Sequence, residues 1–498
     1  MDTYAIAVFD VGKTNKKLLV YDRELRLLDC SYGSFPAFTR EGVDYEDMEG
    51  IEGWFLEQLA LAASRHPIRA ISVTTHGATF ACLDGEGRLS IPVISYTTEP
   101  GEEFREEYYR LAGDRVSLQV ETATAGFAGL LNVAQGIYFV RQRFPAGFAR
   151  TAWILNYPQF FGHYLTGRTG AEPTYVGCHT YLWDFRAMEW SQVASKLGIR
   201  DKLPARLQKP WEVLGPIRPQ IARRTGLAAD TLVTLGIHDS NASLLPYLIK
   251  TKEQFVLNSS GTWCVCMHPA RQVSFSPEEL GKVVFYNLSA FGRPVKTAIF
   301  MGGMEFDTYL GLFKGLGGER PFPVLDLSVY RKLAAERQRF ILPSVVRGTG
   351  QFPASDPVSW DSGRRYPLAE IDKGQRVPPF FRDFPTAYAV LNLSLAIQSK
   401  VAVQRAGLEE GMSLFLEGGF RKNEHYASLL AALFPRCPMY LTNLEEATAF
   451  GAALLAKAAV EGRQPRELDG TFELDKVPVD PLALPELEGY TESFLKLL

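Results

Sequence analysis

The sequence predicts an α/β protein made of two similar halves that face each other across a central cleft. Two short apolar strands carry this prediction, because each runs straight into a turn rich in small polar residues and glycine. The first strand covers residues 4–9, and the second begins near residue 254, about half a chain later. At 498 residues the chain is also too long for one hydrophobic core. We therefore predict two domains, residues 1–248 and 249–498.

Charge and hydropathy exclude two kinds of partner. The chain holds 53 Lys and Arg against 56 Asp and Glu, a formal net charge of −3, and no basic run is longer than Lys16–Lys17. Nucleic-acid binding needs a clustered cationic surface, so we predict no nucleic-acid partner. The longest apolar stretch, residues 448–460, contains Lys457 and is too short to span a bilayer, so we predict no membrane partner.

Two further features bear on the cell compartment. The amino terminus reads as a strand and lacks the basic stretch and apolar core of a leader peptide. The six cysteines show no C-x-x-C spacing, and most lie in apolar surroundings, as reduced core residues do. These features predict a cytoplasmic protein without a disulfide framework.

The first half alternates strand and helix patterns. In chain order we expect three strands (residues 4–9, 17–22 and 26–34), a helix (51–64), a buried strand (70–74) and a hairpin (81–95). The helix has its large apolar residues on one face, and the hairpin has turn chemistry at Asp84–Gly87. One half of a ribonuclease-H-like fold would give this order of elements.

The remaining elements divide into a helical insertion and a second strand-rich half. Residues 101–224 read as mainly helical, with helices at 139–148 and 157–165, and are expected to form a cap over a substrate pocket. The strand pattern restarts at 254–265. Three helices should follow, at residues 388–405, 424–434 and 444–460.

Four short segments stand in one order along the chain, and each alone is a weak signal. They are DVGKTNKK at 10–17, GIHDSN at 236–241, NSSGTW at 258–263 and LEGGFRKN at 416–423. Together they resemble the FGGY carbohydrate kinases of the actin-like ATPase superfamily, over nearly the whole chain. The resemblance implies two ribonuclease-H-like domains around the cleft, with the helical cap inserted in the first. It also implies ATP and Mg²⁺ as cofactors and a small-molecule sugar as substrate, and it leaves room for a homodimer.

The first segment follows a strand and is interpreted as a phosphate-binding turn. Asp10 can hold Mg²⁺, usually through water, because this ion prefers oxygen ligands. The resemblance places Gly12, Thr14, Asn15 and Lys17 at the nucleotide. Related kinases often carry Ser and Arg where this chain has Asn15 and Lys17, and a lysine lacks the planar fork of arginine. Without the resemblance, a hairpin with a solvent-exposed aspartate would be the simpler interpretation.

Asp239 is the candidate catalytic base, and with Asp10 it is a candidate Mg²⁺ ligand. It follows an apolar strand and precedes small residues, and a carboxylate there can take the proton of a sugar hydroxyl. The alternative is a helix N-cap. The resemblance favours catalysis. We expect the neighbouring His238 to pack on the loop or to orient it.

The two later segments are assigned to the nucleotide by resemblance. Residues Ser260, Gly261 and Thr262 would face the transferred phosphate, and Trp263 is expected in the core. Gly418 and Gly419 would let adenine lie against the backbone, and Asn423 would open the next helix. A purely structural turn after a strand is the alternative for this last segment.

Sugar recognition is assigned to the loop after the strand at 70–74. The candidates are Thr75, His76 and Gly77, and Gln159, His179 and Trp183 in the cap are weaker ones. Residues 74–80 contain no lysine or arginine, which an anionic substrate would normally require, so the substrate should be uncharged. The resemblance is strongest to kinases for ketoses such as L-fuculose and L-rhamnulose. Alternatives are a xylulose-, ribulose- or glycerol-type kinase, or a non-kinase ATPase switch.

Overall fold

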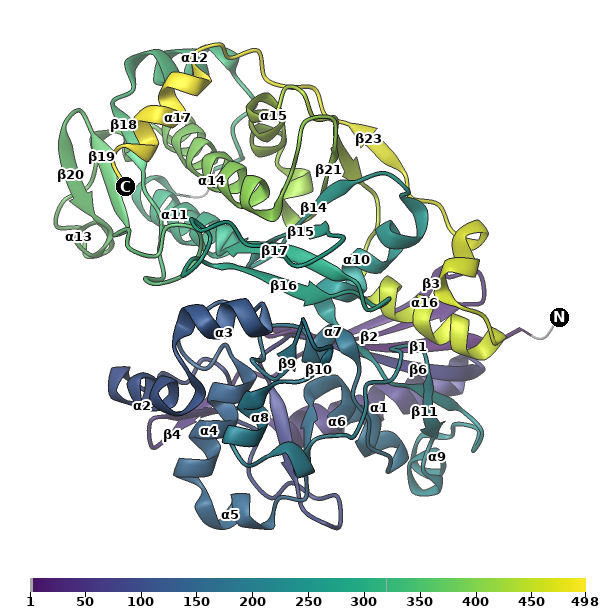
Figure 1. Ribbon diagram of the computed structural model, residues 1–498. Helices are drawn as coiled ribbons and strands as arrows, with labels where there is room; N and C mark the ends of the chain where they lie inside the picture. Colours follow the sequence, from purple (N-terminus) through teal and green to yellow (C-terminus); the bar gives the residue numbers. More distant parts are fainter. Residues whose placement is uncertain (1–2, 319) are drawn as a thin grey trace.

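Each half of the chain contains a mixed seven-stranded sheet, and the two sheets lie in separate layers with helices around them (Figure 1). The computed structural model describes residues 3–318 and 320–498. The predicted α/β class with two actin-like halves is confirmed.

The first sheet has the strand order β11-β12-β6-β1-β2-β3, with β13 paired beside β6. Its strands are β1 (Ala5–Val11), β2 (Asn15–Asp22), β3 (Leu27–Ser34), β6 (Ile68–Thr75), β11 (Val213–Pro216), β12 (Leu232–Thr234) and β13 (Ile237–His238). Strand β1 is antiparallel to β2 and parallel to β6. Every residue of β1 is buried, as expected for a strand covered on both faces.

The second sheet has the order β16-β17-β15-β14-β21-β22-β23. Its strands are β14 (Phe255–Ser260), β15 (Cys264–Pro269), β16 (Val284–Leu288), β17 (Pro294–Phe300), β21 (Ser413–Gly418), β22 (Met439–Thr442) and β23 (Lys476–Pro478). Strand β14 is antiparallel to β15 and parallel to β21. The first sheet has the same arrangement around β1, so the hairpin and its parallel neighbour occur twice.

Helix α1 and the helical cap belong to the first half. The helices are α1 (Met48–Arg65), α2 (Glu102–Ala112), α3 (Arg115–Thr122), α4 (Val133–Arg143), α5 (Pro145–Arg150), α6 (Tyr157–Thr166), α7 (Pro173–Val176), α8 (Gln192–Lys196) and α9 (Pro219–Thr225). The helix expected at 139–148 is wrong in its bounds. The chain breaks at Phe144, and Pro145 starts α5, where its missing N–H costs no helical hydrogen bond.

The hairpin expected at 81–95 forms only next to its turn. The Asp84 N–H donates to Arg88 O at 2.8 Å, the Ser90 N–H donates to Cys82 O at 2.9 Å, and an isolated bridge joins Leu83 to Leu89. The regular pairing of β7 (Phe80–Leu83) is with β8 (Trp153–Asn156) from the cap, on its other edge. The small strands β4 (Phe38–Arg40), β5 (Val43–Tyr45), β9 (Trp183–Asp184) and β10 (Glu189–Trp190) complete this half.

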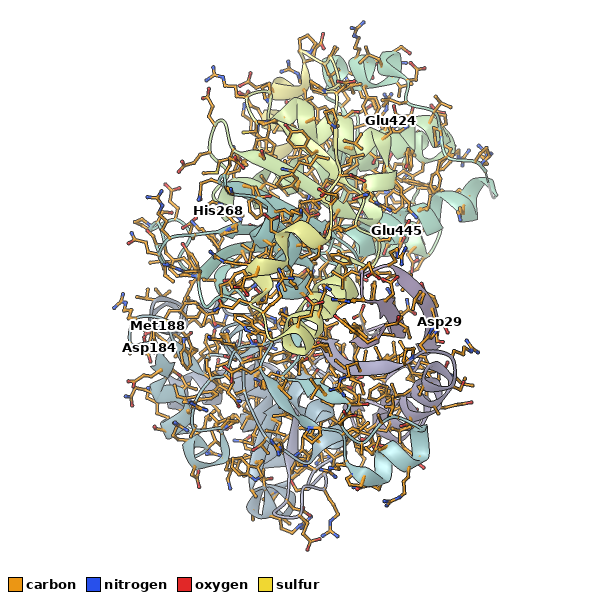
Figure 2. The ribbon with its side chains drawn as sticks, turned by 90° about the vertical axis from the view of Figure 1, so that its right-hand side faces the viewer. Asp29, Asp184, Met188, His268, Glu424 and Glu445 are labelled. Atoms are coloured by element: carbon orange, nitrogen blue, oxygen red, sulfur yellow. The ribbon has the colours of Figure 1, made fainter. Side chains whose placement is uncertain are left out.

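The second half places its helices around the second sheet. They are α11 (Gly302–Gly317), α12 (Leu327–Glu336), α13 (Leu368–Asp372), α14 (Phe384–Ala406), α15 (Glu424–Leu433) and α17 (Leu487–Leu495). A small sheet of β18 (Arg339–Ile341), β19 (Val358–Asp361) and β20 (Arg364–Pro367) packs outside them. Figure 2 shows Glu424 and His268 in this half, Asp29 and Asp184 in the other, and Glu445 near the junction.

Two helices cross between the halves. The last residues of the first half form α10 (Asp239–Lys250), whose Leu244 and Tyr247 pack against the second sheet. Helix α16 (Ala447–Glu461) comes from the second half, yet it packs on β1 and β6 of the first sheet (Figure 1). The two helices touch so closely that a Cβ atom at Gly451 would overlap Ala242 O. Each half therefore contributes one helix to the packing of the other half. The domain boundary at residues 248/249 stays a proposal.

Two further expectations from the sequence concern the cysteines and membrane-spanning helices. The six cysteines are all free thiols. In the parts of the chain that the structure describes, no helix is both long and apolar enough to cross a membrane.

Candidate active site

A cavity of about 830 Å³ lies between the two halves. One wall consists of the turn after β1, the loop after β6, and the start of α10. The other wall consists of the turn after β14 and the end of β21. Among the predicted site residues, those that line the cavity are Asp10, Gly12, Thr14, Asn15, Lys17, His76, Gly77, Asp239, Ser260, Gly261, Thr262, Gly418 and Gly419.

Asp10 and Lys17 face each other across the first hairpin and provide its charge. Their Cα atoms are directly paired between β1 and β2, and Lys17 Nζ lies 2.5 Å from Glu446 Oε2. Burial raises the pKa of Asp10 to about 7, Lys17 lowers it, and the charges of Asp239 and Glu446 raise it further. Buried carboxylates with a raised pKa are frequent at functional sites.

The other two lysines of the first segment lie elsewhere. Lys16 is fully buried and its Nζ donates to Lys13 O at 3.1 Å. Lys13 contacts Glu46 at 2.5 Å, donates to the Ser95 hydroxyl and lies 5.1 Å from the ring centroid of Tyr96. Of these two lysines, Lys13 lines the cavity together with Lys17. The positive charge of Lys13 is paired with the carboxylate of Glu46.

Asp239 begins helix α10 and borders the cavity with 32% of its side chain exposed. Its Oδ1 accepts hydrogen bonds from the Ser240 N–H at 2.6 Å and from Ser240 Oγ at 3.2 Å. The N-cap position belongs to His238, so Asp239 is not the cap of this helix. Burial raises the pKa of Asp239, against the lowering effects of His76 and Ser240.

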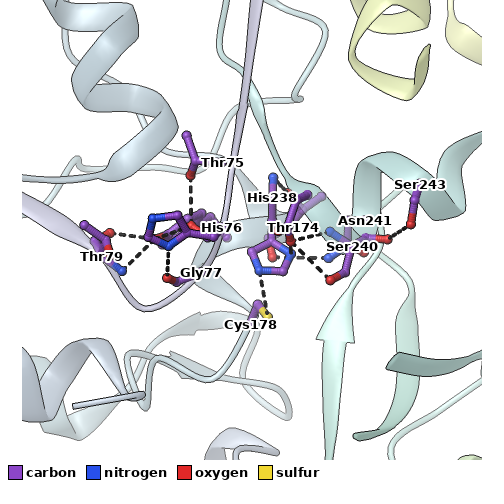
Figure 3. A network of polar contacts seen from close by, with 12 residues as sticks. Thr75, His76, Gly77, Thr79, Thr174, Cys178, His238, Ser240, Asn241 and Ser243 are labelled. Atoms are coloured by element: carbon purple, nitrogen blue, oxygen red, sulfur yellow. Dashed lines mark hydrogen bonds and ion pairs between the residues drawn. The ribbon is translucent and has the colours of Figure 1, made fainter. Parts of the chain in front are cut away.

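A buried carboxylate in the cap holds the loop that contacts Asp239. Glu172 is fully buried, and its Oε1 accepts from Thr174 Oγ1 at 2.8 Å and from the Tyr175 N–H at 2.9 Å. Thr174 Oγ1 in turn accepts the His238 N–H at 3.0 Å (Figure 3). Burial raises the pKa of Glu172 to about 7, although these hydrogen bonds oppose the rise. One hydrogen bond, from the His238 N–H to Thr174, thus joins the cap to the residue before Asp239, and Glu172 holds Thr174 in place.

Imidazole rings line the part of the cavity next to the loop after β6. His76 Nδ1 donates to Gly77 O at 2.9 Å, and His179 Nδ1 donates to Leu131 O at 2.8 Å. Burial lowers the pKa of His76 and His179 to about 4, and that of His238 to about 3, so all three are neutral at neutral pH. His179 also has a φ of +38°, a left-handed conformation that is uncommon for non-glycine residues.

The second phosphate turn is built by close backbone contacts. Ser260 Oγ donates to Glu417 O and accepts the Phe420 N–H at 2.9 Å. Gly418 has a φ of +78°, and a Cβ atom there would overlap Ser260 O. The Glu417 carboxylate lines the cavity beside them, accepts from Tyr247 Oη at 2.9 Å, and has its pKa raised by burial to about 7.

Two predicted site residues do not line the cavity. The Thr75 hydroxyl is buried and donates to His76 O at 3.0 Å. Asn423 caps α15 by accepting the Tyr426 N–H at 3.2 Å, and its Nδ2 donates to Asn392 Oδ1 at 2.7 Å. Asn423 opens the helix as predicted, and its nucleotide contact stays a prediction.

Several cavity residues were missed or misplaced from sequence. Trp263, expected in the core, lines the cavity. Tyr96, Phe127 and Phe285 also line it, and no local motif marks them. Glu417 stands directly before the Gly-Gly pair, which is a signal that could have found it. Of the weaker cap candidates, His179 lines the cavity. Gln159 and Trp183 are not among its lining residues.

Family profiles match both halves of the chain. The profile of the N-terminal domain of the FGGY family of carbohydrate kinases matches residues 5–246. That of the FGGY carbohydrate kinase C-terminal domain matches residues 252–465. The chain is 25% identical to the L-fuculokinase of Salmonella typhi over 278 residues, 54% of this chain. This alignment spans only 58% of the length of that relative.

Solved structures match over nearly the whole length. A carbohydrate kinase from Novosphingobium aromaticivorans is 26% identical with a TM-score of 0.78, over 100% of this chain and 99% of that one. A ligand-bound xylulose kinase from Lactobacillus acidophilus is 17% identical with a TM-score of 0.80, over 99% and 96%. The second likeness shows the fold alone. The resemblance inferred from the four segments is confirmed, and the chain belongs to the FGGY family of carbohydrate kinases.

Proposed function

We propose that this protein transfers a phosphoryl group from ATP to a hydroxyl group of an uncharged sugar, with Asp239 as general base. One observation carries the proposal. The carboxylate of Asp239 lines the same cavity as two phosphate-type turns that come from opposite halves of the chain. A base on one wall and phosphate-binding turns around it are what an in-line transfer between a hydroxyl and a terminal phosphate requires.

The residues around Asp239 prepare it to accept a proton. Oδ1 is already engaged by Ser240, so we assign proton acceptance to Oδ2. The raised pKa makes the carboxylate a stronger base than an exposed aspartate, which favours proton transfer as the new bond to phosphorus forms. The link from Glu172 through Thr174 to the His238 backbone fixes where this carboxylate lies.

The nucleotide is assigned to the turns at residues 10–17 and 260–262 and to the end of β21. Gly419, where a Cβ atom would meet only Ser260 O at 3.8 Å, leaves room for a flat base beside the backbone, and Lys17 lines the same cavity and could offset phosphate charge. Mg²⁺, when bound, would neutralise charge on the transferred phosphate. Asp10 and Asp239 fit this ion, because they offer carboxylate oxygens close enough for the charge of Asp239 to raise the pKa of Asp10.

An uncharged substrate is favoured by the charges on the sugar side. The imidazoles there are neutral, and Lys13 is paired with Glu46. A sugar acid would therefore find no unpaired cation among these groups. The Salmonella relative supports a ketose such as L-fuculose, and L-rhamnulose is a related candidate. A homodimer and a cytoplasmic location stay predictions.

The test is a coupled assay for ADP with a panel of acceptors, namely 6-deoxyketohexoses, ketopentoses, glycerol and gluconate. We expect ADP release to depend on sugar and to be fastest with an uncharged ketose. A preference for gluconate would contradict the uncharged substrate. Equal ATP hydrolysis with and without every acceptor would instead favour an ATPase that works as a conformational switch.

A further inference from the structure

Three side chains of different chemistry meet at the floor of the cavity. Cys178, His179 and His238 each place one potential ligand atom within 4.8 Å of the other two. All three residues line the cavity, and Cys178 and His238 are buried. One thiol and two imidazoles are the ligand types that zinc prefers in proteins.

The distances suit a tetrahedral ion. Cys178 Sγ lies 3.6 Å from His238 Nε2. In a tetrahedral site with Zn–S of about 2.3 Å and Zn–N of about 2.0–2.1 Å, sulfur and nitrogen are about 3.5 Å apart. This edge of the tetrahedron therefore already has the length that a zinc ion requires, and the ion would replace the hydrogen bond between Cys178 and His238.

The imidazoles are also oriented as metal ligands are. His179 Nδ1 donates its hydrogen to Leu131 O, which leaves the lone pair on Nε2. His238 Nδ1 is buried, has no hydrogen-bond partner in the described chain, and lies 3.5 Å from Asp239 Oδ1. Ligating histidines commonly present the second nitrogen to a backbone carbonyl or a carboxylate in this way.

Gly77 leaves space between the two rings. A Cβ atom at this position would lie 2.7 Å from His179 Nε2 and 2.8 Å from His238 Nε2. Any larger residue would fill the region that both Nε2 atoms border. The glycine thus keeps open a small volume bounded by two nitrogen ligands.

We propose that Cys178, His179 and His238 bind a zinc ion through Sγ and the two Nε2 atoms, and that this ion inhibits the enzyme. The fourth position would face the cavity and hold water. Binding releases the thiol proton of Cys178 to solvent and involves no redox change. The site itself does not depend on the proposed function, whereas the inhibition rests on it.

Inhibition follows from the position of His238. With zinc on Nε2, His238 must carry its hydrogen on Nδ1, and the nearest carboxylate to that nitrogen is Asp239. A hydrogen bond from Nδ1–H to Oδ1 would stabilise the ionised carboxylate, and Oδ2 would then be a weaker base for the proton of the sugar. The ion would also take the place of a sugar hydroxyl beside Gly77.

Binding is tested by calorimetric titration of the full chain with Zn²⁺ alone, and by Co²⁺ as an optical probe for a thiolate ligand. We expect one Zn²⁺ per chain and a cobalt–thiolate absorption band. Cys178→Ser and His179→Gln should each weaken Zn²⁺ binding by more than the roughly 10–100-fold lost with an outer-shell partner. The matched controls are Cys437→Ser and His268→Gln, and both should bind as the wild type does. His268 Nδ1 also contacts a backbone carbonyl, Phe255 O at 2.8 Å.

Unchanged Zn²⁺ affinity in both site variants, with circular dichroism showing that they are folded, would overturn the site. A second experiment separates it from the proposed function. Kinase activity is measured with a chelator present, and zinc binding is measured first without ATP or sugar.

The zinc titration is then repeated at a saturating concentration of an accepted sugar. The sugar should raise the apparent Kd for Zn²⁺, and an unchanged Kd would overturn the inhibition. Zinc binding in a protein that phosphorylates no sugar would support the site and contradict the proposed function.

Discussion

The two hairpins that open the two sheets occupy equivalent places but carry different chemistry. In the first sheet, Asp10 at the end of β1 is paired with Lys17 on β2. In the second, Ser260 at the end of β14 is paired with Cys264 on β15. The parallel neighbour differs in the same way. Beside Ser260 lies Gly418, while the strand beside Asp10 leads into His76 and Gly77.

The same arrangement of a hairpin and a parallel strand therefore places different kinds of side chain on the two walls of the cavity. The first hairpin provides charged groups, which suit a metal ion and a phosphate, and the proposed base Asp239 stands on the same wall. The second provides small residues and backbone groups packed against one another, which suit a phosphate or a flat base. Each variant below removes one property from one wall, so that the division can be tested.

The largest effect is expected from removing the base on the charged wall. Asp239→Asn should lower kcat by roughly 10²–10⁴-fold, the usual contribution of a general base, with little change in ATP binding. Steady-state kinetics and nucleotide titration would measure both quantities. Half of the wild-type activity or more in this variant would contradict the assignment.

The second wall is tested by adding one carbon atom. In Gly418→Ala, the new Cβ atom must take a left-handed conformation and meet Ser260 O, so the second turn must move. We expect ATP binding to weaken by about 1.4–3 kcal/mol, roughly 10–100-fold, while binding of sugar alone is retained.

The control for this variant is Gly411→Ala. Gly411 has a similar φ, +85°, but its Cβ atom would meet no atom within 4 Å. It should lose only the roughly 1–2 kcal/mol of stability that the left-handed conformation costs. Equal ATP affinity in the two variants would show that the close contact with Ser260 does not shape the nucleotide site.

A smaller effect is expected from the cap. Glu172→Gln keeps the size of the side chain, but its amide cannot accept both the Thr174 hydroxyl and the two backbone N–H groups. We expect kcat to fall roughly 10-fold, less than the roughly 10²-fold that a 1 Å misplacement can cost. Thr174→Ser keeps the hydroxyl that accepts the His238 N–H and should stay close to wild type. A Glu172→Gln enzyme with wild-type kcat would show that Asp239 does not need this support.

The smallest effect concerns pH. The pKa of Asp10 is raised to about 7, so this carboxyl group is protonated below that pH and ionised above it. If the ionised form holds Mg²⁺, kcat/KM for ATP should rise as the pH increases through about 7. Lys17→Met removes the charge that lowers this pKa, and should move the rise to higher pH.

Glu446→Gln should have the opposite effect to Lys17→Met, because Glu446 raises the pKa of Asp10. In this variant kcat/KM for ATP should begin to rise at a lower pH. Shifts in the same direction in both variants would contradict the role of Asp10 in this pH dependence.

Local sequence patterns predicted the parts of the site that depend on local chemistry. The strands before Asp10, Asp239 and Ser260 were found because an apolar run ends at a polar turn. Long-range pairing was not predictable in this way. The edge of β7 pairs with β8 from the cap, and Phe285 reaches the cavity from a strand with no motif. His179 was a weak candidate because its place depends on a left-handed backbone and on Leu131. The roles of the lining residues stay predictions.

The crossing of α10 and α16 has a consequence for synthesis of the protein. Ile6, Val8 and Ala70 of the first sheet are buried against Phe450 and its neighbours in α16. A ribosome makes the first sheet long before it makes this cover, so the nascent first half exposes an apolar face while the second half is translated. Domains that fold in order during translation normally bury such faces at once, and exposed ones favour aggregation. The first half is therefore most prone to aggregate during the interval before α16 emerges.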